Sequence, residues 1–176
     1  IGFDSACNIS VNKDGTINLT EGSTDIGGSR TSIAMHAAEV LGIPVEDVIP
    51  SVVDTDTIGF TGVTGGSRTT FATGWAAYEA AQEVKTKSIE RAAAIWDVDK
   101  EGLQMEDGII SSKSDPELKM SFKDLARQMS STGGGISGAA AVNPSGVGGS
   151  FAGNIVDVSV DPDTGKVTIE RFTAVQ

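Results

Sequence analysis

Cysteine and histidine are almost absent from this chain of 176 residues, which contains one of each, Cys7 and His36. A single cysteine cannot form an internal disulfide and favours a reducing compartment, so we expect a cytoplasmic protein. One cysteine and one histidine are too few for a zinc or iron–sulfur site bound by side chains. A catalytic triad would have to use His36, which lies within an expected helix without a marked partner. The sequence therefore predicts no metal bound by protein ligands and no catalytic residues.

Basic side chains and long apolar runs are also scarce. The 13 lysines and arginines stand against 24 acidic residues, which gives a formal net charge of −11. A surface of this sign repels nucleic acid and anionic membranes, and no apolar run reaches membrane-spanning length. We therefore expect neither nucleic acid nor a membrane as a partner. Because the chain begins at Ile1 without a methionine and ends at Gln176 within an expected strand, we expect a segment of a longer protein.

Glycine, in contrast, is abundant, with 22 residues that are clustered along the chain. The spacing of apolar residues predicts, in chain order, a hairpin over 3–19, a helix between 31 and 41, a buried strand within 45–53, a helix over about 69–96, a hairpin over 103–111, a short helix over 121–129 and a hairpin over 156–169. Strands and helices mix without regular βαβ alternation, which predicts an α+β fold with mixed hairpins and two main helices.

A low-complexity segment lies between the last predicted helix and the last hairpin. Residues 130–150 hold seven glycines among serines and alanines. Such a composition is typical of a flexible loop, or of a segment that a partner domain orders. We expect one or the other here, within a single domain over 1–176.

The pentapeptide Gly-Gly-Ser-Arg-Thr occurs twice, over residues 27–31 and 65–69, each time immediately before a predicted helix. Glycine pairs let backbone N–H groups approach an anion without interference from Cβ atoms. A helix start adds unpaired N–H donors and the positive end of its dipole. The neighbouring hydroxyl groups can donate hydrogen bonds, while Arg30 and Arg68 can supply charge. Two such loops suit an extended ligand with more than one phosphate or polar head.

An ordinary loop with an N-cap serine or threonine would give the same five residues. The segment is not a Walker loop, because no Gly-Lys-Ser/Thr ends it, and it is not a Gly-x-Gly-x-x-Gly dinucleotide motif. The pattern alone leaves the ligand and the plain loop as equal alternatives. The ligand hypothesis equals the plain-loop alternative only because the pentapeptide is repeated before both main helices.

Several ordered blocks of this chain resemble the second molybdopterin-binding region of the molybdenum hydroxylases, the family of xanthine dehydrogenase, aldehyde oxidase and aerobic carbon monoxide dehydrogenase. The blocks are the Asp14-Gly15 turn, Gly-Ser-Thr-Asp-Ile-Gly at 22–27, Ala-Ala-Glu-Val-Leu-Gly-Ile-Pro at 37–44, Asp-Thr at 54–55, Gly-Gly-Ser-Arg-Thr-Thr at 65–70, Gly-Trp-Ala-Ala at 74–77, Val-Asp-Val at 156–158 and Asp-Pro-Asp-Thr-Gly-Lys-Val at 161–167. They span nearly the whole chain in the family's order.

The resemblance implies roles for individual residues. Gly27 and Gly28 match the glycine loop that touches the pterin. The segment that wraps the phosphate or dinucleotide part of the cofactor is matched by Gly66, Ser67, Arg68, Thr69 and Thr70. The implied cofactor is molybdopterin or molybdopterin cytosine dinucleotide, whose dithiolene sulfurs, not protein side chains, hold the molybdenum. The implied reaction hydroxylates aldehydes or N-heterocycles with oxygen from water, or oxidises carbon monoxide, and passes electrons through iron–sulfur clusters to a flavin or another acceptor.

The chain departs from the family at one place and lacks part of the family's site. Family members usually carry glutamine and then glycine where this chain has Gly28 and Ser29, so one side-chain amide contact to the cofactor is missing. The family's glutamate base lies in segments outside this chain. We therefore expect the isolated segment to bind part of a cofactor and to catalyse nothing. Two alternatives are a non-enzymatic binding or assembly module and a phosphate- or nucleotide-binding domain of another enzyme class.

Overall fold

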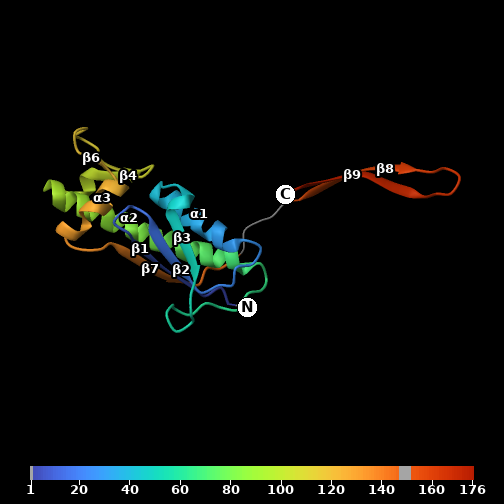
Figure 1. Cartoon of the computed structure of the whole chain (residues 1–176), viewed down its shortest axis with the longest axis horizontal. Helices are drawn as coiled ribbons and strands as arrows, with labels where there is room; N and C mark the ends of the chain where they lie inside the picture. The colour runs from blue at the N-terminus through green and yellow to red at the C-terminus, as the bar shows by residue number, and fades with distance from the viewer. Residues whose placement is uncertain (1, 147–151) are drawn as a thin grey trace. The chain divides into compact units, whose positions relative to one another are not determined.

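The computed structural model describes residues 2–146 and 152–176. It divides into two compact units, Ile1–Ser145 and Gly146–Gln176, which are described separately (Figure 1).

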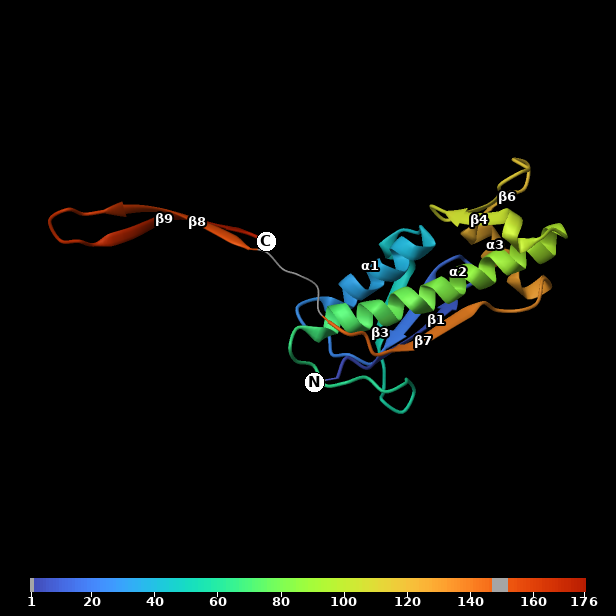
Figure 2. The same ribbon diagram turned by 180° about the vertical axis from the view of Figure 1, so that it is seen from behind.

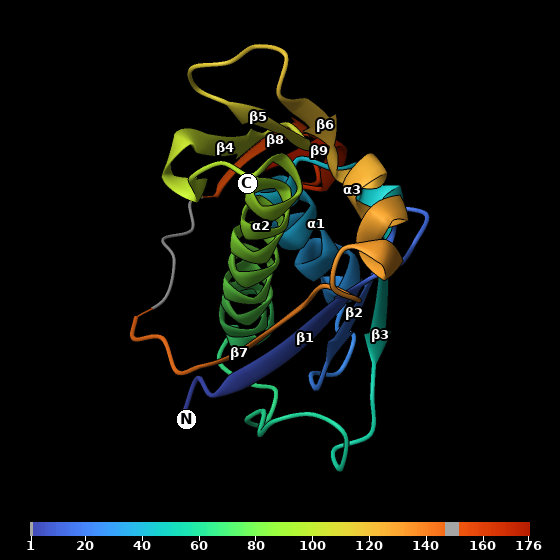
Figure 3. The same ribbon diagram turned by 90° about the vertical axis from the view of Figure 1, so that its left-hand side faces the viewer.

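The first unit is built on a four-stranded sheet with the strand order β3-β2-β1-β7. The strands are β1 (Ser5–Val11), β2 (Ile17–Glu21), β3 (Val48–Val52) and β7 (Ser137–Val142). β1 pairs antiparallel with β2 and β7, whereas β2 and β3 are parallel and are joined through helix α1 (Ser29–Leu41). Helices α1 and α2 (Gly74–Trp96) lie on the same face of the sheet (Figure 3). The predicted α+β fold is confirmed.

The core lies between this sheet and the two helices. Alternate residues of β1 and β2, such as Ile9 and its partner Leu19, point into it, as expected from their spacing. Small residues let α2 approach the sheet closely, because a Cβ atom on Gly138 would lie 2.2 Å from the carbonyl oxygen of Ala80. The apolar residues of α2 that are fully buried are Ala76, Ala77, Ala80, Ala81, Val84 and Ala92.

Three sequence expectations differ from the structure in this unit. The strand within 45–53 is not buried: a 3₁₀ turn precedes it, and β3 is an exposed edge strand, a position that suits Pro50 because proline has no N–H to donate. The helix expected from residue 69 begins with a π-helical turn, Thr69–Thr73, before α2. Residues 130–150 are not all loop, because Ser137–Val142 forms β7, while 147–150 lie outside the described residues.

A smaller sheet packs at the far end of α2. It contains β4 (Leu103–Glu106), β5 (Ile109–Ser112) and β6 (Lys119–Ser121), followed by helix α3 (Phe122–Gln128). Short 3₁₀ turns, Lys100–Gly102 and Met129–Ser131, flank this group. The predicted hairpin and short helix are confirmed here.

The second unit is the hairpin of β8 (Gly153–Val160) and β9 (Val167–Val175), which the alternating valines predict. Its turn is closed by a hydrogen bond from the Gly165 amide to the Asp161 carbonyl, 2.8 Å. A register shift, or β-bulge, lies between Asp157 and Val158 along the pair.

Candidate functional site

The two glycine loops of the sequence lie side by side. We call residues 22–28 the first loop and residues 61–67 the second loop. Both lie at the same end of the helix pair, before α1 and before the π-helical turn that leads into α2 (Figures 1 and 2). The Thr24 and Thr64 hydroxyl oxygens are 3.5 Å apart, and a Cβ atom on Gly22 would lie 2.9 Å from the Thr61 hydroxyl oxygen. The fold therefore brings the repeated motifs to one place.

Each loop ends in two successive residues with left-handed backbone conformation. In the first loop these are Gly27 and Gly28, with φ of 58° and 83°, and in the second they are Gly66 and Ser67, with φ of 59° and 60°. Positive φ at two successive residues is the pattern of a type I′ turn, and the hydrogen bond that closes such a turn leaves the N–H groups of these two residues unused. Ser67 holds this conformation without being glycine, at a cost of about 1 kcal/mol.

The structural repeat is shifted by one residue from the sequence repeat. The turn closes from the Ser29 amide to the Ile26 carbonyl, 3.0 Å, in the first loop, and from the Arg68 amide to the Gly65 carbonyl, 3.4 Å, in the second. Ser29 therefore occupies the structural position of Arg68, and not that of Ser67. This shift explains why the two identical pentapeptides place their arginines in different surroundings.

The outward amides are available for a ligand. Within residues 2–146 and 152–176, the N–H groups of Gly27, Gly28, Gly66 and Ser67 have no hydrogen-bond partner, and all four residues are exposed. A Cβ atom placed on any of the three glycines would meet no atom within 4 Å. The loops thus face open space with unpaired donors next to two helix starts, an arrangement that attracts anions.

The arginines do not supply free charge at this surface. Arg68 is 0% exposed, and its guanidinium donates to the Gly62 carbonyl and the Ser5 hydroxyl, both at 2.6 Å, and to the Asp4 carbonyl. Arg30 is exposed and paired with Asp25, at 3.3 Å between side chains. The sequence expected Arg68 to face a ligand, whereas its side chain ties the second loop to the start of β1.

The two threonines after Arg68 have different surroundings. Thr70 is exposed, whereas Thr69 is buried and its hydroxyl oxygen has no hydrogen-bond partner among the described residues. A buried hydroxyl without a partner is uncommon in native proteins, and it marks a position where a ligand or water is expected. Thr69 therefore holds an unpaired, enclosed hydroxyl two residues after the second loop.

Beneath the loops lies a group of buried polar side chains that sequence reasoning missed. Ser5, Ser23 and Thr73 contact one another through their hydroxyl groups, and Glu21 is buried beside them. Burial raises the pKa of Glu21, although a hydrogen bond from the Ser23 amide opposes this. The only signal in the sequence was Ser5, a polar residue on the inward face of an otherwise apolar alternating strand.

Cys7 and His36 have structural roles. Cys7 is fully buried, and burial together with the nearby Glu21 carboxylate raises the pKa of its thiol well above the usual range. The His36 ring bonds through Nδ1 to the Ser32 carbonyl, 2.7 Å, and lies against Gly74, where a Cβ atom would be 3.0 Å away. In the part of the chain that the structure describes, no three metal-ligating side chains gather, and no helix could cross a membrane.

Comparison with known proteins shows which family the sequence matches. The family model described as "Molybdopterin cofactor-binding domain" matches residues 2–176. The chain is 34% identical over 168 residues to the putative xanthine dehydrogenase molybdenum-binding subunit of Escherichia coli (strain K12), a match that covers 92% of this chain and 22% of the relative. It is 28% identical over 184 residues to the nicotine 6-hydroxylase large subunit of Paenarthrobacter nicotinovorans, covering 99% and 22%.

A solved structure shares the fold. The crystal structure of the Cu,Mo-CO dehydrogenase in its carbon monoxide-reduced state matches with a TM-score of 0.83 and 29% identity, over 98% of this chain and 22% of that one. The chain thus spans about a fifth of the length of the relatives that it matches.

Proposed function

The chain belongs to the molybdopterin cofactor-binding domain family of the molybdenum hydroxylases, and on this premise we propose that its two glycine loops hold the phosphate-bearing part of the cofactor. The observation that carries the proposal is the convergence of two loops with four unpaired, outward amides. Phosphate oxygens need several donors, which these amides and the two helix starts supply. The likeness of residues 2–176 to the family supports the same ligand.

The donor set fits an anionic group in an acidic chain. The net charge of −11 gives no long-range attraction, so local dipoles must hold the phosphate. The unpaired hydroxyl of Thr69 adds a donor beside the amides of Gly66 and Ser67. When bound, the molybdenum–pterin group supplies the redox centre, and the residues of this chain bind and orient it.

Finer assignments extend the proposal. We propose Gly27 and Gly28 as contacts of the pterin end, and Gly66, Ser67, Thr69 and Thr70 as contacts of the phosphate or dinucleotide end. We propose that Arg68 holds the second loop in place, because its guanidinium group already donates hydrogen bonds inside the protein. The two loops, as separate donor sets, suit the cytosine dinucleotide form, which carries more than one phosphate.

The rest of the enzyme lies outside this chain. We propose that the parent protein is a cytoplasmic oxidoreductase that hydroxylates aldehydes or N-heterocycles, or oxidises carbon monoxide, with iron–sulfur and flavin partners. The relatives named as large or molybdenum-binding subunits support a multi-subunit assembly. We further propose that residues 1–176 form only part of the molybdopterin-binding region, which the 22% coverage of those relatives supports.

Substitution of glycines in the two loops by asparagine tests the proposal. Asparagine tolerates left-handed φ, so Gly27→Asn and Gly66→Asn add a side chain in the open space with little strain. We expect each variant of the native subunit to retain about tenfold less cofactor, because the added side chain occupies the space in which a phosphate would accept hydrogen bonds from the loop amides. The measurements are molybdenum content and the pterin and cytosine nucleotide released on denaturation.

The matched control is Gly165→Asn in the hairpin turn, which also has positive φ, 69°, and open space around its Cβ position. It should leave the cofactor content unchanged. A native subunit without pterin, or loop variants that keep a full complement, would contradict the proposal. A nucleotide other than one linked to pterin would favour a different class of enzyme.

A further inference from the structure

A chain of buried hydroxyl groups connects the two glycine loops below their surface. Thr73, at the end of the π-helical turn, is 0% exposed, and its hydroxyl oxygen lies 2.6 Å from that of Ser23 and 3.1 Å from that of Ser5. Ser23 belongs to the first loop. Ser5 in turn accepts a hydrogen bond from Arg68, which follows the second loop. Thr73 therefore connects Ser23 of the first loop to Ser5, which in turn bonds to Arg68 at the end of the second loop.

The hydroxyl groups form a continuous hydrogen-bonded chain. A guanidinium group can only donate, so the Ser5 hydroxyl accepts from Arg68. The Ser5–Thr73 and Thr73–Ser23 contacts each join two hydroxyl groups, either of which can be the donor. Hydrogen bonds in such a network are stronger inside a low-dielectric interior. Loss of the central hydroxyl would remove the hydroxyl partner of Ser23 and one of the two partners of Ser5.

The backbone provides no substitute for this connection. Among the described residues, no backbone hydrogen bond joins the first loop to the second. The second loop is instead bonded to the start of β1, through the Gly62 amide to the Asp4 carbonyl at 2.8 Å and through Arg68 to Ser5. The first loop is held through the Ser23 amide, which bonds to the buried Glu21 carboxylate at the end of β2. Each loop is thus bonded to its own strand, and these two strands pair in the sheet. Direct hydrogen bonding between the two loop regions is made by side chains, at the surface between Thr24 and Thr64 and below it through Thr73.

We propose that Thr73 is a positioning residue that holds the two glycine loops in register, so that their outward amides address one anionic group. The inference rests on the proposed function, because it names what sets the geometry of that binding site. Thr73 itself is fully buried, so its side chain does not reach the exposed surface of the loops. Its side chain acts through Ser23 on the first loop and through Ser5 and Arg68 on the second. The π-helical turn Thr69–Thr73 is the local structure that presents it, and such turns are frequent at functional sites.

Two substitutions at one position separate the hydroxyl group from the shape of the side chain. Thr73→Val keeps the branched shape and removes the hydroxyl, whereas Thr73→Ser keeps the hydroxyl. Hydrogen exchange is followed by NMR at the amides of Ser23 and Gly62, one bonded amide in each loop. We expect the Thr73→Val variant to raise both exchange rates about tenfold, relative to the amides of the core strands, because buried polar groups are left unsatisfied. In the Thr73→Ser variant, both rates should stay within about twofold of those of the unsubstituted chain.

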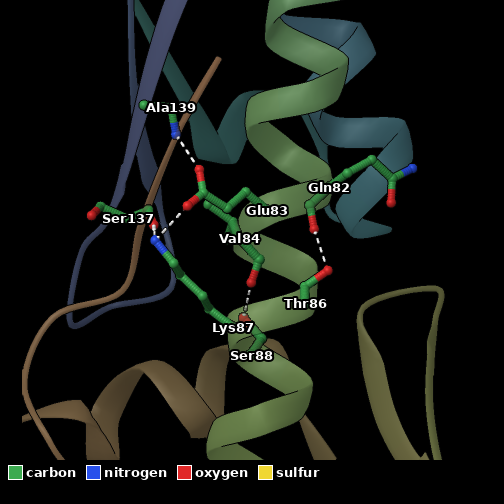
Figure 4. Close-up of polar contacts among 8 residues, drawn as sticks. All are labelled: Gln82, Glu83, Val84, Thr86, Lys87, Ser88, Ser137 and Ala139. Carbon is green, nitrogen blue, oxygen red and sulfur yellow. Dashed lines mark hydrogen bonds and ion pairs between the residues drawn. The ribbon is translucent and has the colours of Figure 1, made fainter. Parts of the chain in front are cut away.

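The matched control is Ser88→Ala. Ser88 also has a fully buried hydroxyl, which donates to the Val84 carbonyl at 2.7 Å (Figure 4). It lies within α2, the helix that follows the π-helical turn, well beyond its first turn. Its removal should lower overall stability without a selective change at Ser23 and Gly62. Should Thr73→Val not fold, Ser5→Ala breaks the same chain one link away, and it should accelerate exchange at Gly62 in the same way.

The inference would be overturned if Thr73→Val exchanged both amides at the rates of the unsubstituted chain. It would also be overturned if Thr73→Val and Thr73→Ser raised the two exchange rates equally. A second readout is the cofactor content of the native subunit, which should fall about tenfold in Val and be retained in Ser. The two proposals fail differently. If the native subunit contains no pterin, the proposed function is wrong, while the exchange result on Thr73 still holds. If the native subunit contains pterin but Thr73→Val leaves both exchange rates unchanged, only the role of Thr73 is wrong.

Discussion

At the scale of the residue, the two arginines of the repeated pentapeptide show that an identical local sequence does not fix the surroundings of a side chain. Identical neighbours predict identical roles, yet Arg30 is exposed and Arg68 is fully buried. The shift of one residue between the sequence repeat and the structural repeat causes this difference, because Ser29 and Arg68 occupy equivalent positions at the turn. The left-handed Ser67, where glycine would be expected, results from the same shift.

The buried arginine leads to a prediction on stability. Arg68→Met should lower the free energy of unfolding by about 2 kcal/mol or more, because it removes the donor of the Gly62 carbonyl and one of the two partners of both the Asp4 carbonyl and the Ser5 hydroxyl. Arg30→Met should change it by less than about 1 kcal/mol, since an exposed ion pair contributes little. Urea unfolding followed by circular dichroism measures both. Equal losses in the two variants would mean that the buried guanidinium does not stabilise the loop.

At the scale of the element, β7 is an edge strand whose free edge is covered by side chains of α2. Glu83 accepts a hydrogen bond from the Ala139 amide, 2.7 Å, and Lys87 donates to the Ser137 carbonyl, 2.8 Å (Figure 4). The two side chains also pair with each other at 2.7 Å. A bare strand edge invites pairing with another chain, so this pair occupies backbone groups that a further strand would use.

Removal of the pair should promote self-association. Glu83→Ala with Lys87→Ala frees the Ala139 amide and the Ser137 carbonyl, and we expect a larger weight-average mass in sedimentation experiments, with less than about 1 kcal/mol lost in stability. The control is Glu90→Ala with Lys100→Ala, an exposed pair at 2.7 Å that also involves α2 and touches no strand edge. Association of both double variants to the same extent would show that the loss of charge, not the free edge, is responsible.

At the scale of the whole molecule, the β8–β9 hairpin is a unit with two different faces. Cross-strand pairs place six exposed apolar side chains on one face: Val156, Val158, Val160, Val167, Ile169 and Phe172. The bulge keeps Phe172 on the same face as Ile169, although the two lie three positions apart in the sequence. The other face carries the Asp157–Arg171 ion pair, at 2.9 Å. A two-stranded ribbon is marginal in water, so this face is expected to need a partner surface.

The apolar face therefore gives a prediction for the chain by itself. Val158→Thr with Ile169→Thr should reduce its self-association and its binding of an apolar dye, because strand propensity is kept while the apolar stripe is interrupted. Ile155→Thr is the control, since Ile155 is equally exposed but pairs with Thr173 on the polar face. Sedimentation and dye fluorescence measure the two effects. No difference between the double variant and the control would argue against the stripe as a contact surface.

The sequence by itself determined the elements and the place of the binding loops. Periodic apolar spacing, the Asp-Gly turn at 14–15 and the glycine pairs before both helices are local signals, and local backbone preference is enough to read them. The family could be predicted because its motifs keep their order along the whole chain. β7 was missed because its alanines and glycine carry no strand propensity, and pairing with β1 alone makes them a strand.

Only the tertiary structure decided which groups of the loops stay exposed and unpaired and which hold the fold together. Burial depends on what packs above a residue, and nothing in the local sequence of Arg68 shows that β1 will lie over it. The chain of hydroxyl groups through Thr73 joins residues from three separate segments, so their meeting follows from the packing of α2 on the sheet. Long-range contacts of this kind are set by the whole fold, and that is why the amides, but not the arginines, remained free at the loops.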